Sequence, residues 1–203
     1  RQGDNLYSDS VVALDPKTGR RKWHFQFTPH DVHDYDAQQP IVLVDATWQG
    51  KPRKLLLQAN RNGYFYVLDR MSGEFLSGTP FIKPITWASG LTKDGRPIVV
   101  PNMDPTPEGR RVCPSLEGAS NWYSASFSPR TGLFYVQTND KCGIFTRTPM
   151  EWEAGKGFMG GSFGQAPNEP AQRVLRAIDI NTGKSKWELP QSGAVNSWGG
   201  VLS

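Results

Sequence analysis

The sequence predicts an all-β protein that forms part of a β-propeller, and two observations lead to this fold class. The 203 residues include 21 Gly, 16 Pro and 7 Trp, a turn-rich and aromatic-rich composition that favours short strands over long helices. A turn motif also recurs at intervals of roughly 50 to 60 residues, a period typical of propeller blades. Its four copies correspond to about four blades, some of them incomplete, which is too few to close a ring.

The recurring motif has two close copies, at residues 13–23 and 177–187, each with an Asp, a Thr-Gly pair and a Trp eight residues after the Asp. Two weaker copies, at 67–73 and 126–132, lack the Trp. In every copy the Asp or Ser side chain can bind backbone amides of a turn and the Gly can adopt a positive φ, so each copy predicts a hairpin. The Trp suits docking between adjacent sheets, with its ring buried and its N–H on a carbonyl.

The remaining stretches complete the predicted elements. Residues 54–66 are expected to form two strands joined by a turn at 61–63. Residues 79–112 and 143–173 are rich in Gly, Pro and polar residues without sustained alternation, so we expect loops over one face of the propeller. The chain opens within a motif and ends just after an apolar, Gly-rich run. We therefore expect residues 1–203 to be an internal segment of a single propeller domain.

Composition and charge argue against several functional classes. No run approaches the roughly 20 apolar residues of a membrane span, so we expect a soluble protein. The net charge of +4 comes from Lys and Arg scattered over turns, without a basic stripe carrying interleaved aromatic residues. Nucleic-acid binding is therefore not expected. The two cysteines lack C-x-x-C spacing, which argues against a zinc site.

Cys113 and Cys142 could be a pair of buried thiols or a disulfide. We favour the disulfide, because Cys142 ends a predicted strand and Cys113 lies in a Pro-rich loop, where a covalent link would help. A disulfide implies an oxidising compartment.

The densest chemistry lies in residues 28–36, where three carboxylates and two imidazoles occur within seven residues. Side chains at positions i and i+2 of an extended segment lie on the same side, so Asp34 and Asp36 could converge on one cation or one proton. The alternative is a solvated loop whose Asp residues make local turns.

These motifs together carry a family resemblance. The repeats, the G-D-N-L-Y at 3–7, the T-P-H-D-x-x-D at 28–34 and the N-R-N-G at 60–63 resemble the quinoprotein alcohol dehydrogenases of the methanol dehydrogenase type. The resemblance runs along essentially the whole chain. It implies about four blades of an eight-bladed propeller in a periplasmic protein that holds pyrroloquinoline quinone (PQQ) and a metal ion, either Ca²⁺ or a lanthanide. It also implies a small alcohol as substrate and a cytochrome c-type electron acceptor, and it leaves open a homodimer and membrane association through regions outside this chain.

The resemblance assigns roles to individual residues. Asp34 matches the catalytic base that takes the hydroxyl proton of the alcohol, and Asp34 and Asp36 are the expected metal ligands. Arg61 matches the arginine that donates to the quinone oxygens, where it would contact the cofactor and stabilise the charge that develops on reduction. A purely structural arginine in a turn is the alternative for Arg61.

Further cofactor contacts are expected from Asn121, Trp122 and Trp198. Asn121 matches a cofactor-contacting Asn in the loop between the two cysteines, whose separation of 29 residues also fits the family's disulfide. For Trp198 the alternative is another docking residue between blades.

Two residues bear on selectivity. The calcium-type enzymes have a non-acidic residue at the position of Asp36, whereas the lanthanide-type enzymes resemble this chain, and an extra carboxylate favours a trivalent ion. Asp36 could instead face solvent or bond to a turn. His33 replaces an aromatic residue common in the family, which changes the polarity of the substrate pocket; it could hydrogen-bond Asp34 or be a satisfied structural histidine. His30 and Asp31 are expected to support the site.

Three functions follow: a PQQ-dependent alcohol dehydrogenase, which the resemblance favours, a quinoprotein acting on sugars or polyols, and a non-catalytic propeller scaffold of the cell envelope. The family's remaining metal ligands and the Trp under the cofactor would lie before Arg1. We therefore expect the 203 residues alone to expose unpaired sheet edges and to be inactive without the rest of the site.

Overall fold

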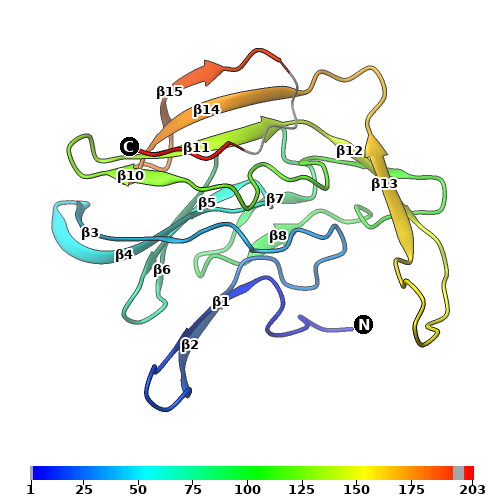
Figure 1. The fold of residues 1–203 in the computed structure, drawn as a ribbon, viewed down its shortest axis with the longest axis horizontal. Helices are drawn as coiled ribbons and strands as arrows, with labels where there is room; N and C mark the ends of the chain where they lie inside the picture. The colour runs from blue at the N-terminus through cyan, green and yellow to red at the C-terminus, as the bar shows by residue number, and fades with distance from the viewer. Residues whose placement is uncertain (1, 194–198) are drawn as a thin grey trace.

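In the computed structural model, which describes residues 2–193 and 199–203, the chain is all-β, as the sequence predicts (Figure 1). No helix occurs in these residues, and hence none that could cross a membrane. The fifteen strands in this part of the chain are β1 (Ser10–Leu14), β2 (Arg21–Gln26), β3 (Val42–Trp48), β4 (Lys51–Ala59), β5 (Tyr64–Asp69), β6 (Phe75–Pro80), β7 (Ala88–Leu91), β8 (Pro97–Val99), β9 (Arg110–Val112), β10 (Ser126–Ser128), β11 (Leu133–Asp140), β12 (Gly143–Arg147), β13 (Gly161–Gln165), β14 (Gln172–Asp179) and β15 (Ser185–Pro190).

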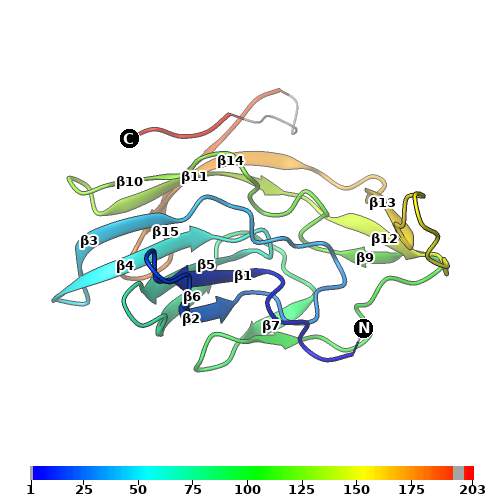
Figure 2. The same ribbon diagram turned by 60° about the horizontal axis from the view of Figure 1, so that its bottom comes forward.

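Two sheets have the four antiparallel strands of a complete propeller blade. One has the order β3-β4-β5-β6 and the other the order β10-β11-β14-β15. A three-stranded sheet, β13-β12-β9, and the hairpins β1-β2 and β7-β8 complete the described fold. Figure 2 shows the four-stranded sheets layered one above the other. The β1-β2 hairpin lies next to β5 and β6, on the side away from the sheet that contains β11 and β14.

Strand β5 explains how the layers are held together. The side chains of residues 64–68 are buried and belong alternately to two different apolar clusters, as the period of two in a strand requires. On one face Phe65 packs against Phe134 of β11, with ring centroids 5.0 Å apart. On the other face Tyr66 packs against Phe25 of β2, at 5.8 Å. A strand buried on both faces places its preceding turn deep in the molecule.

The four repeated motifs each join two paired strands, which confirms the predicted hairpins. At Asp15, Asp69 and Asp179 one carboxylate oxygen accepts hydrogen bonds from the backbone amides two and three residues later. At Ser128 the expectation was wrong in detail, because the backbone carbonyl, not the side chain, accepts the turn amides. A serine hydroxyl is a weaker turn acceptor than a carboxylate.

Tryptophan docking is confirmed in part for one repeat, because Trp23 contacts the next sheet but is only half-buried and makes no Nε1 hydrogen bond to a described residue, and it is not confirmed for the other repeat. The Trp23 ring lies so close to the turn of the next sheet that a Cβ on Gly73 would be 2.6 Å from it. Trp187, in contrast, is 41% exposed in the described chain. The sequence also missed Trp48, which is buried and donates from Nε1 to the carbonyl of Ile180, 3.0 Å away, linking the two four-stranded sheets.

The predicted pair of strands in residues 54–66 is confirmed by β4 and β5. The expectation of loops at 79–112 and 143–173 was partly wrong, because these stretches contain β7, β8, β9, β12 and β13. These five strands have three to five residues each. Alternation is hard to recognise over so short a stretch.

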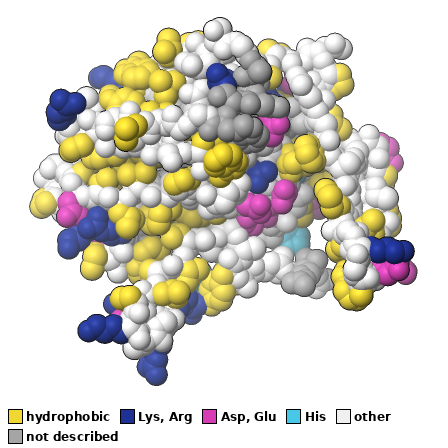
Figure 3. Space-filling model, in the orientation of Figure 1, with side chains coloured by type: hydrophobic (Ala, Val, Ile, Leu, Met, Phe, Trp, Pro, Cys, Tyr) yellow, Lys and Arg dark blue, Asp and Glu magenta, His cyan; other side chains and the backbone are white. Residues whose placement is uncertain are grey.

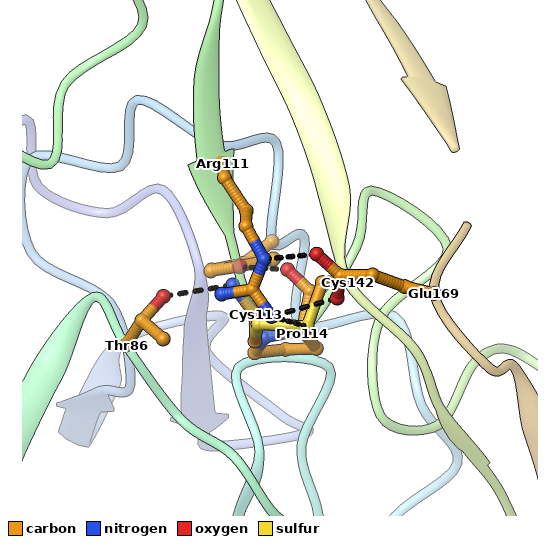
Figure 4. Close-up of a disulfide and its surroundings, with 7 residues drawn as sticks. Thr86, Arg111, Cys113, Pro114, Cys142 and Glu169 are labelled. Carbon is orange, nitrogen blue, oxygen red and sulfur yellow. Dashed lines mark hydrogen bonds and ion pairs between the residues drawn. A yellow bond between two sulfur atoms is a disulfide. The ribbon is translucent and has the colours of Figure 1, made fainter. Parts of the chain in front are cut away.

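The predicted disulfide between Cys113 and Cys142 is present and joins the end of β9 to the start of β12. Figure 4 shows its surroundings, where Arg111 lies across the sulfur atoms. The Arg111 guanidinium pairs with Glu169 and also lies 3.2 Å from Sγ of Cys142. The disulfide closes the loop that carries Asn121.

Candidate functional site

The acidic segment, which comprises residues 27–41, connects β2 to β3 and contains no strand. Asp34 has a φ of 61°, so the expectation of an extended backbone at this residue was wrong. The carboxylate of Asp31 shapes the bend, since it accepts hydrogen bonds from the amides of His33 at 2.9 Å and Tyr35 at 2.5 Å. Asp31 thus takes the supporting position expected for it, while His30 contacts the carbonyl of Gly3 at 2.9 Å.

The bend brings Asp34 and Asp36 to the same arginine. The turn between β4 and β5 presents Arg61, whose Nη1 lies 3.5 Å from Oδ2 of Asp36 and whose Nη2 lies 3.9 Å from Oδ2 of Asp34. The arginine is buried, whereas the two carboxylate side chains are 60% and 63% exposed. A buried guanidinium therefore faces two carboxylates at the edge of an open space.

The orientation of Arg61 is fixed from behind. Its Nε donates to the carbonyl of Leu116, 2.7 Å away, in the loop closed by the disulfide. Among the described residues, Nη1 and Nη2 have no acceptor closer than the two carboxylates and Gln38, at 3.3 Å or more. Their hydrogen atoms thus remain directed to the open side, where an anionic or carbonyl oxygen could bind them.

Buried amide side chains tie both ends of the acidic segment to the Arg61 turn. At the start of the segment, Asn62 Nδ2 donates to the carbonyl of Phe27 and to Oγ1 of Thr28, each at 3.2 Å. At its end, Gln58 Nε2 donates to the carbonyl of Gln39 at 2.9 Å. Hydrogen bonds from buried amides restrict how the segments that they join can be arranged, so the carboxylates and Arg61 are positioned together.

Asn121 reaches the same site through Gln38. The end of the Gln38 side-chain amide lies 3.2 Å from Oδ1 of Asn121, whose own Nδ2 donates to the carbonyl of Glu117 at 2.8 Å. Trp122 follows with its amide on Asn121 Oδ1 and a side chain that is 55% exposed. Asn121 thus lies beside Arg61 and the acidic segment, and Trp122 adjoins it. Trp198 lies outside the described residues.

Four carboxylates, including the two that face Arg61, line a cavity of about 910 Å³. They belong to Asp9, Asp31, Asp34 and Asp36, and Figure 3 shows acidic side chains beside a basic one in the middle of this face. Burial, followed by the charges of the other three, raises the pKa of Asp9 to about 7. Burial is also the main cause that raises the pKa of Asp31, to about 6.

The pKa of Asp34 is raised as well, first by partial burial and then by the Asp36 charge, while Arg61 opposes the shift. A cation beside these carboxylates would favour the ionised form that a proton acceptor needs.

The donor chemistry fits a hard cation only in part. Carboxylate oxygens such as those of Asp34 and Asp36 are the ligands that Ca²⁺ prefers, but such an ion takes 6–8 oxygen ligands. The described part of the chain contains no cluster of three or more His, Cys, Asp or Glu side chains arranged to hold a metal. These residues could therefore provide one side of a metal site and not all of it.

A second cavity, of about 450 Å³, adjoins the other side of Asp34. His33 lines it and is buried, with Nε2 2.8 Å from the carbonyl of Met103 and its ring packed against Tyr35 and Phe145. His33 thus bonds to a backbone carbonyl, and its ring makes no hydrogen bond to Asp34. Burial lowers the pKa of His33, which keeps its ring neutral.

Residues 1–80 match a family model described as the glucose/ethanol/alcohol dehydrogenase β-propeller domain, of the PQQ class. Over its whole length the chain is 42% identical to the quinoprotein alcohol dehydrogenase PedH of Pseudomonas putida. The chain belongs to the quinoprotein alcohol dehydrogenase family. It is also 35% identical to a lanthanide-dependent methanol dehydrogenase of Methylorubrum extorquens, again over the whole chain.

A solved structure of this family gives the same fold. The quinohemoprotein alcohol dehydrogenase of Comamonas testosteroni matches 98% of the chain with a TM-score of 0.87 and 37% identity. The chain spans 35% of PedH, 36% of the methanol dehydrogenase and 31% of the quinohemoprotein. It therefore corresponds to about a third of a quinoprotein alcohol dehydrogenase, in agreement with the predicted partial propeller.

Sequence reasoning missed the residues that orient the site. Leu116 acts through its carbonyl, which no side-chain pattern reveals. Asp9 lies 22 residues before Asp31 and reaches the cavity only through the fold. The polar run that includes Asn60 and Asn62 gave a usable signal, because amide side chains between two apolar strands must find partners in the interior.

Proposed function

We propose that this chain provides the Asp34 and Arg61 side of an alcohol dehydrogenase site that uses PQQ and a metal ion. The observation that carries the proposal is the buried Arg61 guanidinium facing two carboxylates, 3.5 and 3.9 Å away, that line an open cavity. The similarity to quinoprotein alcohol dehydrogenases along the whole chain supports it.

Asp34 is proposed as the general base. Its carboxylate is accessible, lies next to a neutralising guanidinium and borders both cavities, so an alcohol in either space can reach it. Removal of the hydroxyl proton by Asp34 lets the carbon release hydride as the carbonyl forms. When bound, PQQ supplies the two-electron acceptor for that hydride. Arg61 then donates from its terminal nitrogens to oxygens that become more negative on reduction.

Asp34 and Asp36 are proposed as ligands of the metal, and Arg61, Asn121, Trp122 and Trp198 as contacts of the cofactor. An additional carboxylate at Asp36 supports a trivalent lanthanide over Ca²⁺, since the attraction grows with the product of the charges. The rest of the coordination shell would be supplied by residues other than these two. The propeller of residues 1–203 is proposed to belong to a single cofactor-binding domain.

The disulfide supports a periplasmic location, because such bonds persist in oxidising compartments. A cytochrome c-type protein is proposed as the electron acceptor. A non-catalytic scaffold would not require a buried arginine aimed at two accessible carboxylates, so the enzyme is the better explanation of the site.

The test is dye-linked oxidation of primary alcohols by the natural full-length protein, loaded with PQQ and either Ca²⁺ or La³⁺. Asp34→Asn keeps the shape and removes the base, so activity should fall by at least 10²-fold. Asp45→Asn is the matched control, because Asp45 is exposed and pairs with Arg70 away from the site. Absence of PQQ-dependent oxidation with either metal, or full activity of Asp34→Asn, would refute the proposal.

A further inference from the structure

The cavity of about 450 Å³ beside Asp34 has one apolar wall and one polar end. Leu116, Phe145, Phe158 and Phe163 contribute to the apolar wall. Three potential acceptors lie at the lining of the same cavity, namely the carboxylates of Asp34 and Asp104 and the ring of His33. Figure 3 shows this face of the molecule hollowed between the main body and the part that carries β13, which Figure 1 places at the right.

The ring of His33 is oriented so that it offers an acceptor. Its Nε2 lies 2.8 Å from the Met103 carbonyl, which can only accept, so Nε2 carries the hydrogen. The other nitrogen of a neutral imidazole, Nδ1, then has a free lone pair. The described residues donate no hydrogen bond to Nδ1, so its lone pair can accept from a molecule bound in the cavity that His33 lines.

Asp104 adds a second acceptor. Its side chain is exposed, it lines the same cavity as His33, and its carboxylate takes part in no hydrogen bond or ion pair among the described residues. Arg147 also lines the cavity, but two carboxylates outweigh one guanidinium. This balance disfavours an anionic substrate such as a sugar acid and favours a neutral hydrogen-bond donor.

We propose that the preferred substrates are diols, in which one hydroxyl gives its proton to Asp34 and the second donates to His33 Nδ1 or to Asp104, while the carbon chain lies on the apolar wall. This inference rests on the proposed function and specifies its substrate class. A simple alcohol would fill the same space but offer no second hydroxyl to His33 Nδ1, whose ring is buried. A site built to bond a hydroxyl discriminates against analogues that lack it.

The experiment compares 1-butanol with 1,2-, 1,3- and 1,4-butanediol, which share a primary hydroxyl and the number of carbons. In the full-length holoenzyme, kcat/KM for at least one diol should exceed that for 1-butanol by about 10-fold. His33→Phe keeps an aromatic ring between Tyr35 and Phe145 and should lower the diol-to-butanol ratio by about 10-fold. His33→Gln, whose amide can donate to Met103 and still accept, should recover part of it.

Asp104→Ala changes an exposed residue, so it tests the inference even where a His33 variant does not fold. Asp104→Ala should also lower the diol-to-butanol ratio of kcat/KM, whereas Asp45→Asn should leave this ratio unchanged. A ratio below one for all three diols, or the same ratio in His33→Phe and Asp104→Ala as in the wild type, would overturn the inference while the alcohol dehydrogenase stands. Failure to oxidise any of the four alcohols with PQQ would overturn the proposed function, and the inference with it.

Discussion

Asn62 and Thr28 join the turn that carries Arg61 to the start of the acidic segment, through a hydrogen bond of 3.2 Å from Asn62 Nδ2 to Thr28 Oγ1. The same nitrogen lies 3.0 Å from the Tyr66 hydroxyl, and Asn62 Oδ1 accepts from the amide of Tyr64. The Asn62 side chain is fully buried. The Asn62 amide thus contributes to the relative position of the guanidinium and the carboxylates.

Replacement of Asn62 by Leu should destabilise the protein by about 2–3 kcal/mol, because it leaves buried donors and acceptors without partners. The midpoint of urea denaturation measures the effect. Asn102→Gly is the matched control: Asn102 is exposed with a φ of 62°, which glycine adopts freely, so the change should stay within about 0.5 kcal/mol. Equal midpoints for Asn62→Leu and Asn102→Gly would contradict the role of Asn62.

The hairpins could be predicted from the sequence because their signals are local. At Asp15 and Gly19, a carboxylate that binds the next amides and a residue with positive φ define the turn within five residues. The cysteine pair could be predicted for a related reason, since only two cysteines are present. The cavities could not, because Asp9 and Asp34, or His33 and Phe163, meet only when separate sheets pack.

Arg61→Lys should lower alcohol oxidation by about 10²-fold. Lysine keeps the charge but loses both the planar fork and the Nε bond to Leu116, so it cannot hold two donors in a fixed direction. Steady-state kinetics of the holoenzyme measure the loss. Arg70→Lys, at an arginine that pairs with exposed Asp45, should be nearly silent. Retention of wild-type kcat by Arg61→Lys would return Arg61 to the structural alternative.

Asp36→Ala should abolish activity supported by La³⁺, because the variant removes one carboxylate from a site that must balance a trivalent ion. Titration of the PQQ-loaded protein with La³⁺ and with Ca²⁺, followed by activity, measures the preference. The La³⁺ dependence should weaken more than the Ca²⁺ dependence. An unchanged La³⁺ titration would show that Asp36 binds no metal and serves only as a partner of Arg61.

Stability should fall as the pH rises from about 4 to 7 in the protein without metal and cofactor. The pKa of Asp9 is raised from 3.8 to about 7 in the folded protein, so the folded state binds more protons than the unfolded state in this window. The free energy of unfolding therefore decreases with rising pH. Asp9→Asn, which carries no charge, should be more stable than the wild type at pH 8, by on the order of 2 kcal/mol after allowance for partial exposure.

Melting curves across this pH range, with and without added La³⁺, test the Asp9 prediction. A cation bound beside the carboxylates should flatten the pH dependence, since it offsets their mutual repulsion. A wild-type protein whose melting temperature does not fall between pH 4 and 7 would contradict the electrostatic account of this cavity.

Removal of the disulfide should lower the stability of the fold and also weaken the binding of PQQ at the site. The bond closes a loop of 29 residues, so Cys113→Ser with Cys142→Ser should cost about 3–4 kcal/mol of stability. The same loop carries the Leu116 carbonyl that orients Arg61, and Asn121 beside it. We therefore expect the double variant, assayed well below its melting temperature, to bind PQQ more weakly by about 10-fold. Affinity for PQQ, measured by fluorescence titration, separates this effect from stability. If the disulfide only stabilised the fold, its removal would lower the melting temperature and leave the affinity of the folded protein for PQQ unchanged.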